Sequence, residues 1–125
     1  MILSLRQALG LEFAMISTVL ALMLSTAAQA SDPVVVPRRA YNLCLSNFMR
    51  AQLRDGVDEA AFDTAIETAC RDQESSLREA IIQRAMNMGD RRPVAERDAA
   101  AEIDDYQANA RELFREHKEN NTLPE

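Results

Sequence analysis

The sequence predicts an all-α protein, a small up-down-up three-helix bundle with one disulfide between its first and second helices. Two observations lead to this prediction. From residue 31 on, apolar residues recur at helical spacing in three segments, and the glycines and prolines fall outside the interiors of these segments. The only two cysteines lie at matching distances from the expected turn between the first two helices. A chain of 125 residues fits a single domain.

Residues 1–30 are interpreted as a cleavable secretory signal peptide. The apolar run Phe13–Leu24 is too short for a bilayer span, which takes about 20 residues, but it suits the core of a signal peptide. Arg6 supplies a positive charge ahead of this core, and Ala28 and Ala30 form the A-x-A pattern of a cleavage site before Ser31. The sequence therefore predicts export to the bacterial periplasm or to the exterior.

Two alternatives to this interpretation stay open. Glu12 lies directly before the apolar core, where a positive flank is typical, so an uncleaved amphipathic or anchoring helix is the other interpretation. Met15 is a second candidate start besides Met1, and a chain that began there would keep only its terminal amine as the positive charge. A bacterial lipoprotein is disfavoured because no cysteine follows Ala30 directly.

Residues 31–37 are expected to form an extended leader, because two residues of this segment each precede a proline, which disfavours a helical conformation. The three-helix domain is expected over residues 38–118. Its first helix begins near Pro37, a residue suited to the first helical turn, and runs to Asp55. Gly56 follows as a C-terminal cap.

The second helix has a strong start signal in Asp58, a residue type that caps helix N-termini. Its apolar stripe continues to Met88, and Gly89 closes it, which gives a length of about 45 Å at 1.5 Å per residue. A break near Ser75–Ser76 is left open, because the second of these serines and Glu79 have the spacing of a capping box.

The third helix begins near Pro93, and its apolar seam alternates gaps of three and four residues, a heptad-like pattern. The seam consists of Ala99, Ile103, Tyr106, Ala110, Leu113 and His117. The polar residues 119–125 are expected to form a frayed tail. The expected core consists of the large apolar residues on the three stripes: Tyr41, Phe48, Phe62, Ile66, Leu77, Ile81, Ile103, Tyr106, Leu113 and Phe114.

Cys44 and Cys70 are expected to form a structural disulfide. In an antiparallel hairpin of the first two helices, each cysteine lies 11 residues from the turn, about 16 Å along its helix. Both also lie on apolar stripes, and an exported protein reaches a compartment where disulfides persist. The alternatives are a redox couple, which is usually C-x-x-C, and a zinc site, which needs two further ligands.

No pattern in the sequence predicts a catalytic site, a metal site or a cofactor. His117 is the only histidine, and no G-x-S-x-G motif accompanies it, so a partly exposed structural histidine is expected. Met86 and Met88 have the spacing of thioether ligands for Cu(I), but two methionines at a helix end are more typical of packing. Five acids of the third helix alternate with arginines, as on a solvated face: Glu102, Asp104, Asp105, Glu112 and Glu116.

The net charge of −6 argues against nucleic acid and anionic lipid as partners. The charge is uneven, because residues 31–56 carry a net charge of +2 and the rest of the domain is acidic. The basic residues of the first helix are Arg38, Arg39, Arg50 and Arg54. We expect them to pair with acids of the second helix, which are Asp58, Glu59, Asp63 and Glu67. The alternative is that they dock an acidic partner surface.

These observations predict a small exported helical protein that is not an enzyme. The preferred function is a protein-interaction module, such as an adaptor, an inhibitor or a chaperone-like binder, marked by an exposed stripe on the second and third helices. The alternative is a periplasmic metal- or small-ligand-binding protein using Met86, Met88 and His117, although the last two lie at opposite ends of the third helix. A protein partner is expected, and no stable membrane span after cleavage. A homodimer that shares the long helices is the alternative to a monomer, because an Ala-rich core buries little area.

Overall fold

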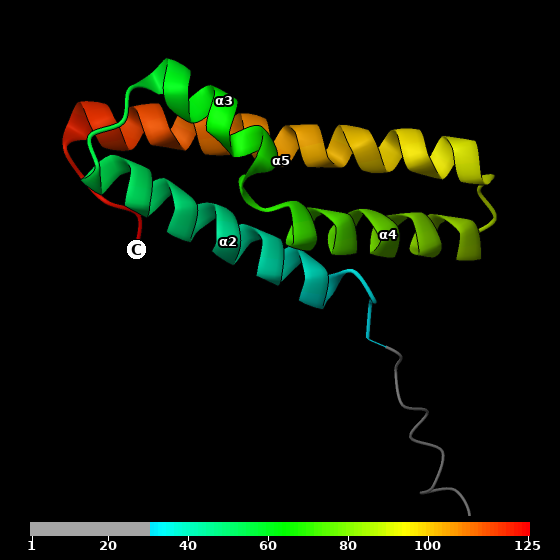
Figure 1. Ribbon diagram of the computed structural model, residues 1–125. Coiled ribbons are helices and arrows are strands. Elements are labelled where there is room, and N and C mark those ends of the chain that lie inside the picture. The colour runs from blue at the N-terminus through cyan, green and yellow to red at the C-terminus, as the bar shows by residue number, and fades with distance from the viewer. Residues whose placement is uncertain (1–30) are drawn as a thin grey trace, which may run out of the picture. The chain divides into compact units, whose positions relative to one another are not determined.

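The computed structural model describes residues 31–125, which form four α-helices and no strand (Figure 1). The helices are α2 (Val35–Arg54), α3 (Glu59–Ala69), α4 (Arg71–Asn87) and α5 (Arg92–Asn120). The all-α prediction is confirmed for this part of the chain. The count of three helices is wrong, because the expected second helix is divided into α3 and α4. Within residues 31–125, none of the helices combines the length and apolar character that a membrane crossing needs.

The expected second helix is broken at Cys70 and not at the serines. Cys70 has φ −124° and ψ 41°, outside the helical region, and it is the single residue between α3 and α4. Ser75–Ser76 lies inside α4, where the hydroxyl of the second serine donates to the carbonyl of Asp72 at 3.0 Å. The apolar stripe keeps its helical period through residue 70, so we attribute the break to the tertiary position of Cys70, which is bonded to Cys44 on α2.

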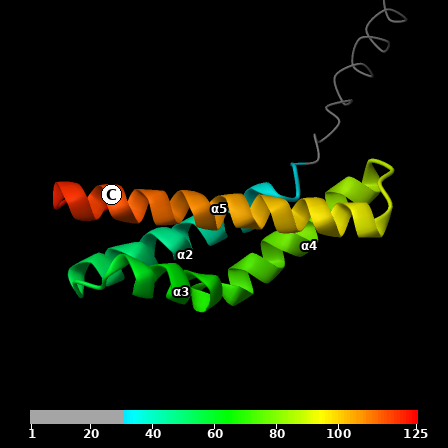
Figure 2. The same ribbon diagram turned by 90° about the horizontal axis from the view of Figure 1, so that it is seen from above.

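Of the helices in residues 31–125, α5 is the longest, and the other three pack against it (Figures 1 and 2). α4 runs antiparallel to its first half, α3 lies against its second half, and α2 packs on both α4 and α5. The chain therefore follows the predicted up-down-up order, with the descending leg divided between α3 and α4. The second part of the expected long helix packs mainly on the last helix, as predicted.

α2 begins two residues before Pro37, so the predicted extended leader is too long. Pro37 falls in the first turn of α2, where its missing N–H has no intrahelical partner to lose. Val34 is fully buried, and its N–H donates to the carboxylate of Asp32 at 3.0 Å. This burial and this hydrogen bond fix the start of α2, although a helical conformation is disfavoured for Val36, the residue before Pro37.

The core contains most of the residues that the sequence predicts. Seven of them are buried: Tyr41, Phe62, Ile66, Leu77, Ile81, Ile103 and Phe114. Phe48 and Tyr106 are partly buried and pack against this cluster. Leu113 is 36% exposed, so its assignment to the core is wrong. Val34 and Ile82 are buried although they were not among the predicted core residues.

The buried seam of α5 drifts away from the predicted heptad. Its members are Ala95, Ala99, Ile103, Gln107, Ala110 and Phe114. A straight helix has 3.6 residues per turn and drifts by about 20° per heptad relative to a 3.5-residue repeat. Gln107 and Phe114 accordingly occupy the places that the heptad gave to Tyr106 and Leu113.

Three phenylalanines from three helices stack at the end of the fold where α3 lies. The Phe62 ring of α3 stacks on the Phe114 ring of α5 with 3.9 Å between centroids and an interplanar angle of 5°. The Phe48 ring of α2 lies 5.7 Å from the Phe62 ring at 25°. This stack therefore ties α2, α3 and α5 together.

The end of the chain folds back on α2 instead of fraying as predicted for residues 119–125. α5 continues to Asn120, and Asn121 takes a left-handed conformation with φ 52°, which asparagine tolerates. The N–H of Thr122 donates to a carbonyl in the last turn of α5 at 2.9 Å. The carbonyl of Pro124 accepts two hydrogen bonds from Arg50.

Candidate functional site

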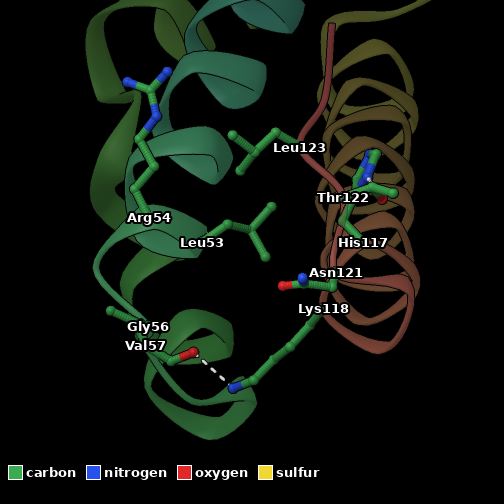
Figure 3. A pocket seen from close by; sticks show the side chains of 9 residues that line it. All are labelled: Leu53, Arg54, Gly56, Val57, His117, Lys118, Asn121, Thr122 and Leu123. Carbon is green, nitrogen blue, oxygen red and sulfur yellow. Dashed lines mark hydrogen bonds between the residues drawn. The ribbon is translucent and has the colours of Figure 1, made fainter.

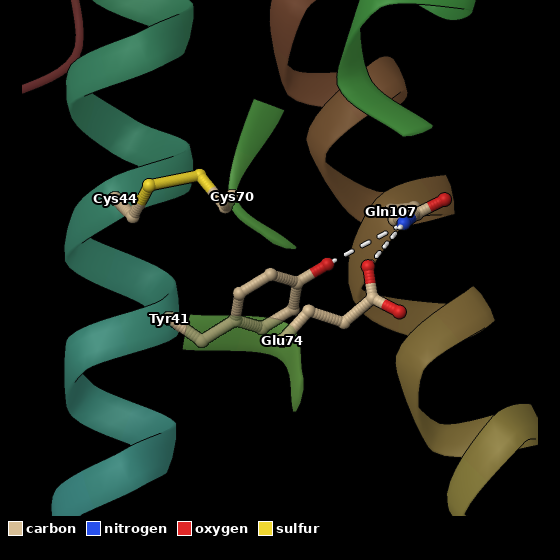
Figure 4. Close-up of a disulfide and its surroundings, with 5 residues drawn as sticks. All are labelled: Tyr41, Cys44, Cys70, Glu74 and Gln107. Atoms are coloured by element: carbon tan, nitrogen blue, oxygen red, sulfur yellow. Dashed lines mark hydrogen bonds between the residues drawn. A yellow bond between two sulfur atoms is a disulfide. The ribbon is translucent and has the colours of Figure 1, made fainter. Parts of the chain in front are cut away.

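Cys44 and Cys70 form the predicted disulfide, with 6.1 Å between their Cα atoms (Figure 4). The bond joins the middle of α2 to the junction of α3 and α4. Cys70 is buried and Cys44 is half-buried beside it. Both sulfurs are used in this bond, so neither serves as a thiolate nucleophile or metal ligand while the bond is closed.

A polar cluster that the sequence did not reveal lies beside the disulfide. The side-chain amide of Gln107 donates to the Tyr41 hydroxyl at 3.5 Å and to a Glu74 carboxylate oxygen at 3.4 Å (Figure 4). Burial raises the pKa of the Tyr41 phenol above its ordinary value, and the hydrogen bond from Gln107 partly offsets this effect. Glu74 also accepts from Arg78 at 2.7 Å, so the cluster joins α2, α4 and α5 as a satisfied structural element.

Of the residues at the predicted cleavage site, Ala28 and Ala30 lie outside the described residues, as does the whole predicted signal peptide. Ser31 is the first described residue and is exposed. The hydrogen bond from Val34 N–H is the main cause that holds the pKa of the Asp32 carboxyl below its ordinary value, and Arg84 adds to the effect from 3.3 Å. The segment that follows the predicted cleavage point is therefore tied to α4.

The candidate ligands for a soft metal do not converge. His117 is half-buried near the end of α5, and its Nδ1 lies 2.8 Å from the hydroxyl of Thr122. Met86 and Met88 are 36% and 72% exposed at the opposite end of α5, about 40 Å away at 1.5 Å rise per residue. Within residues 31–125, no three His, Cys, Asp or Glu side chains are grouped as a metal ion would need.

The acids of α5 are used differently from one another. Glu102 binds Arg38 of α2 at 3.1 Å and lies 4.0 Å from Arg84 of α4, so it bridges two helices. The other four acids that the sequence assigned to a solvated face are exposed: Asp104, Asp105, Glu112 and Glu116. A single bridging carboxylate among exposed ones gives no pair suited to acid–base chemistry.

The predicted pairing of the α2 arginines with acids of the second helix is wrong. Arg38 binds Glu102 of α5, and Arg50 binds the carbonyl of Pro124. Asp63 and Glu67 face Arg111 of α5 at 3.7 and 3.6 Å instead. The carboxylate of Asp58 accepts from the N–H of Ala61 at 2.8 Å and caps α3, as its position predicted. The prediction is wrong because α3 lies along α5, which places the acids of α3 beside Arg111 and not beside the arginines of α2.

Arg39, Arg50 and Arg54, of which Arg50 also binds Pro124, belong to one side of α2, which we call the outer face of α2. It is defined by Val36, Arg39, Leu43, Arg50 and Arg54, which fall within an arc of about 60° at 3.6 residues per turn. Val36 is 77% and Leu43 60% exposed. α2 contains no acidic residue, and within residues 31–125 no carboxylate lies within 4.0 Å of Arg39, Arg50 or Arg54.

Two shallow depressions flank Leu43 on the surface of α2. One, of about 500 Å³, is lined by Val35, Arg38, Arg39, Asn42 and Leu43. The other, of about 630 Å³, lies over the disulfide and is lined by Leu43, Cys44, Phe48 and Ala69 among others. Leu43 therefore stands between two hollows.

A third depression, of about 440 Å³, lies between the turn after α2 and the end of α5 (Figure 3). Leu53 and Leu123 point toward each other across it, and the amine of Lys118 donates to the carbonyl of Val57 at 2.8 Å. Arg54, His117 and Lys118 are its titratable residues. Because two helix C-termini converge there, the positive charges of Arg54 and Lys118 match the partial negative charge of the helix ends, and we assign these two residues this role.

A fourth depression is the groove between α2 and α5, of about 250 Å³. Its lining includes Leu45 and Met49 of α2 and Ala110 and Leu113 of α5, and Pro124 lies at its edge. Sequence reasoning could not find this groove, because the exposed position of Leu113 follows from the drift of the α5 seam.

Comparisons of the chain with protein-family models, with curated proteins and with solved structures find no match.

Proposed function

We propose that this chain is an exported protein-interaction module and that the outer face of α2 docks an acidic surface of its partner. The observation that carries the proposal is the composition of that face. It combines two strongly exposed apolar side chains with three arginines that have no carboxylate partner in residues 31–125. Arginine is one of the residue types enriched at interface hot spots, and exposed apolar side chains beside it supply area that docking removes from water.

The charge of the outer face favours an acidic partner. The chain carries a net charge of −6, yet α2 carries four arginines and no acid. Screening limits charge interactions to about 8 Å at physiological ionic strength, so a docked surface senses the local arginines more than the net charge. Carboxylates opposite Arg39 and Arg54 form charge-assisted hydrogen bonds that the isolated chain lacks.

A second copy of this chain is a poorer occupant. A symmetric contact through α2 places the arginines of one copy against those of the other, which costs free energy. Two copies also carry the same net charge. The partner is therefore a different protein, with carboxylates and apolar side chains on one surface.

Export is supported by two independent observations. The order of charge, apolar run and A-x-A pattern in residues 1–30 is typical of a signal peptide. A closed Cys44–Cys70 bond is typical of proteins in oxidising compartments.

Site-specific photo-crosslinking in cells of the source organism tests the proposal. A photoreactive amino acid replaces Leu43 on the outer face of α2 and, as a matched control, Thr64 on the exposed side of α3. We expect a discrete adduct from the first position only, with an acidic segment of the partner at the crosslinked point. The adduct should weaken as salt is raised, because exposed ion pairs are screened.

Charge reversal supplies the second arm of this experiment. We expect the double substitution Arg39→Glu and Arg54→Glu to abolish the adduct. Arg91→Glu with Arg115→Glu changes the net charge equally at exposed sites outside α2 and should leave it unchanged. An adduct that persists after reversal on α2, or that is lost equally in both double variants, contradicts the proposal.

A further inference from the structure

The tail of this chain reaches the edge of the groove between α2 and α5. After the left-handed Asn121 the tail turns back from the end of α5 toward α2 (Figure 1). Pro124 reaches the edge of the groove, and its carbonyl accepts from both Nε and Nη2 of Arg50, at 3.1 and 2.8 Å. The edge of the groove therefore accommodates a short stretch of chain, which Arg50 holds through a backbone carbonyl.

The hydrogen bonding at Arg50 is incomplete. Nε and Nη2 of a guanidinium form a planar fork that matches the two oxygens of a carboxylate. Here both donors share one neutral carbonyl oxygen. A carboxylate in this position would give each donor its own oxygen and would add charge assistance, so it is the better ligand for Arg50.

The rim of the groove offers further unused polar groups. Asn42 and Ser46 of α2 and Asn109 of α5 line it, and their side chains make no hydrogen bond within residues 31–125. An asparagine amide has two donors and an acceptor, the groups that a peptide backbone pairs with. The floor is apolar, with Leu45 and Met49 buried and Leu113 half-exposed above them.

We propose that the α2–α5 groove binds an extended segment of the acidic partner, with a carboxylate on Arg50 and an apolar side chain against Met49 and Leu113. The chain's own tail is then a weak competitor at the same place. This inference rests on the proposed function, and it names the part of the partner that α2 and α5 bind together, an extended segment with a carboxylate. A tail tethered at this distance has an effective concentration on the order of millimolar, so a partner segment must bind more tightly than the tail does.

NMR titration of the oxidised, ¹⁵N-labelled chain of residues 31–125 tests the inference. The probe is an acetylated and amidated peptide of sequence Asn-Thr-Leu-Pro-Glu, and its control ends in Gln. Each peptide is added to the full chain and to a chain that ends at Asn121. We expect shifts in the side-chain amides of Asn42 and Asn109, and about fivefold weaker binding of the Gln peptide, because it lacks charge assistance. The full chain should bind the Glu peptide more weakly than the shortened chain does.

Two substitutions test whether Arg50 is the residue that distinguishes the two peptides. Arg50→Gln should erase the difference between the two peptides, whereas Arg115→Gln, at an exposed site of α5 outside the groove, should preserve it. Equal binding of both peptides, shifts confined to residues outside the groove, or no binding overturns the inference. If the peptide results overturn the groove but the crosslinked adduct at Leu43 still forms, the proposed function stands without the groove. If that adduct does not form either, the proposed function itself is overturned.

Discussion

Cys44 on α2 is bonded to Cys70, and Cys70 is also the single non-helical residue between α3 and α4. One bond thus fixes two features of the fold: the position of α2 along the bundle and the point where α3 ends and α4 begins. The aromatic stack lies on one side of this bond and the Tyr41 cluster on the other. The bond therefore lies between the two halves of the core.

We expect reduction of this disulfide to lower the free energy of unfolding by about 3.5 kcal/mol, because the bond closes a loop of roughly 27 residues in the unfolded chain. Urea unfolding with and without reductant measures the effect. The double substitution Cys44→Ala with Cys70→Ala should have the stability of the reduced chain and show no further response to reductant. Equal stability of the oxidised and reduced chains would contradict the structural role of the bond.

The α5 seam is tested by two neighbouring residues. Phe114→Ala removes a ring that is stacked and 1% exposed, and should destabilise the fold by about 3–5 kcal/mol. Leu113→Ala removes a side chain that is 36% exposed, and should cost about 1 kcal/mol or less. Chemical unfolding of the two variants side by side makes the comparison. If Leu113→Ala destabilised the fold more than Phe114→Ala, the result would favour the heptad seam that the sequence predicted.

Stability should depend on Tyr41 at high pH. Burial raises the pKa of its phenol in the folded chain, so the folded state holds this proton more tightly than the unfolded state does. The contribution is fully present below the unfolded pKa of about 10 and is lost as the pH rises through the folded pKa. We expect the urea midpoint of the natural chain to fall between pH 9 and about 11.5 more steeply than that of Tyr41→Phe. Tyr106→Phe, which keeps Tyr41, should retain the steep fall.

The start of the domain should respond to acid through Asp32. The pKa of Asp32 is lowered in the folded chain, mainly by the hydrogen bond from Val34 N–H. Its contribution to stability is therefore present above its ordinary pKa of 3.8 and is lost as the pH falls through the folded pKa. The Val34 amide resonance should therefore titrate with a midpoint below 3.8. Asp32→Asn should remove this titration. A midpoint at or above the ordinary value would show that the Asp32–Val34 contact is absent in solution.

Local signals in the sequence predicted much of the fold. Asp58 caps α3, and Gly56 follows α2 with a positive φ of 68°, because these are properties of a residue and its immediate neighbours. The disulfide followed from equal distances to one turn. The break at Cys70 did not, since residue 70 continues the helical period and only the packing of α3 along α5 and of Cys70 against α2 requires the break.

The candidate binding surface is not the one that the sequence favoured, which was an exposed stripe on the second and third helices. The excess of arginine on the first helix was visible in the sequence, and so was the acidic-partner alternative. Which arginines lack a carboxylate depends on the helix that lies beside them, as Arg38 with Glu102 and Arg111 with Asp63 show. The seat of Pro124 on Arg50 depends on the reversal at Asn121, which a polar tail sequence does not specify.

Native mass spectrometry of the chain recovered from its own cell envelope, without reductant, tests the central claim most directly. The account predicts a subunit that begins at Ser31, is two hydrogens lighter than the reduced chain, and travels in a complex with an acidic protein. The complex should be absent for the Arg39→Glu and Arg54→Glu chain. A chain that retains residues 1–30, or a complex that survives this charge reversal, would contradict the account.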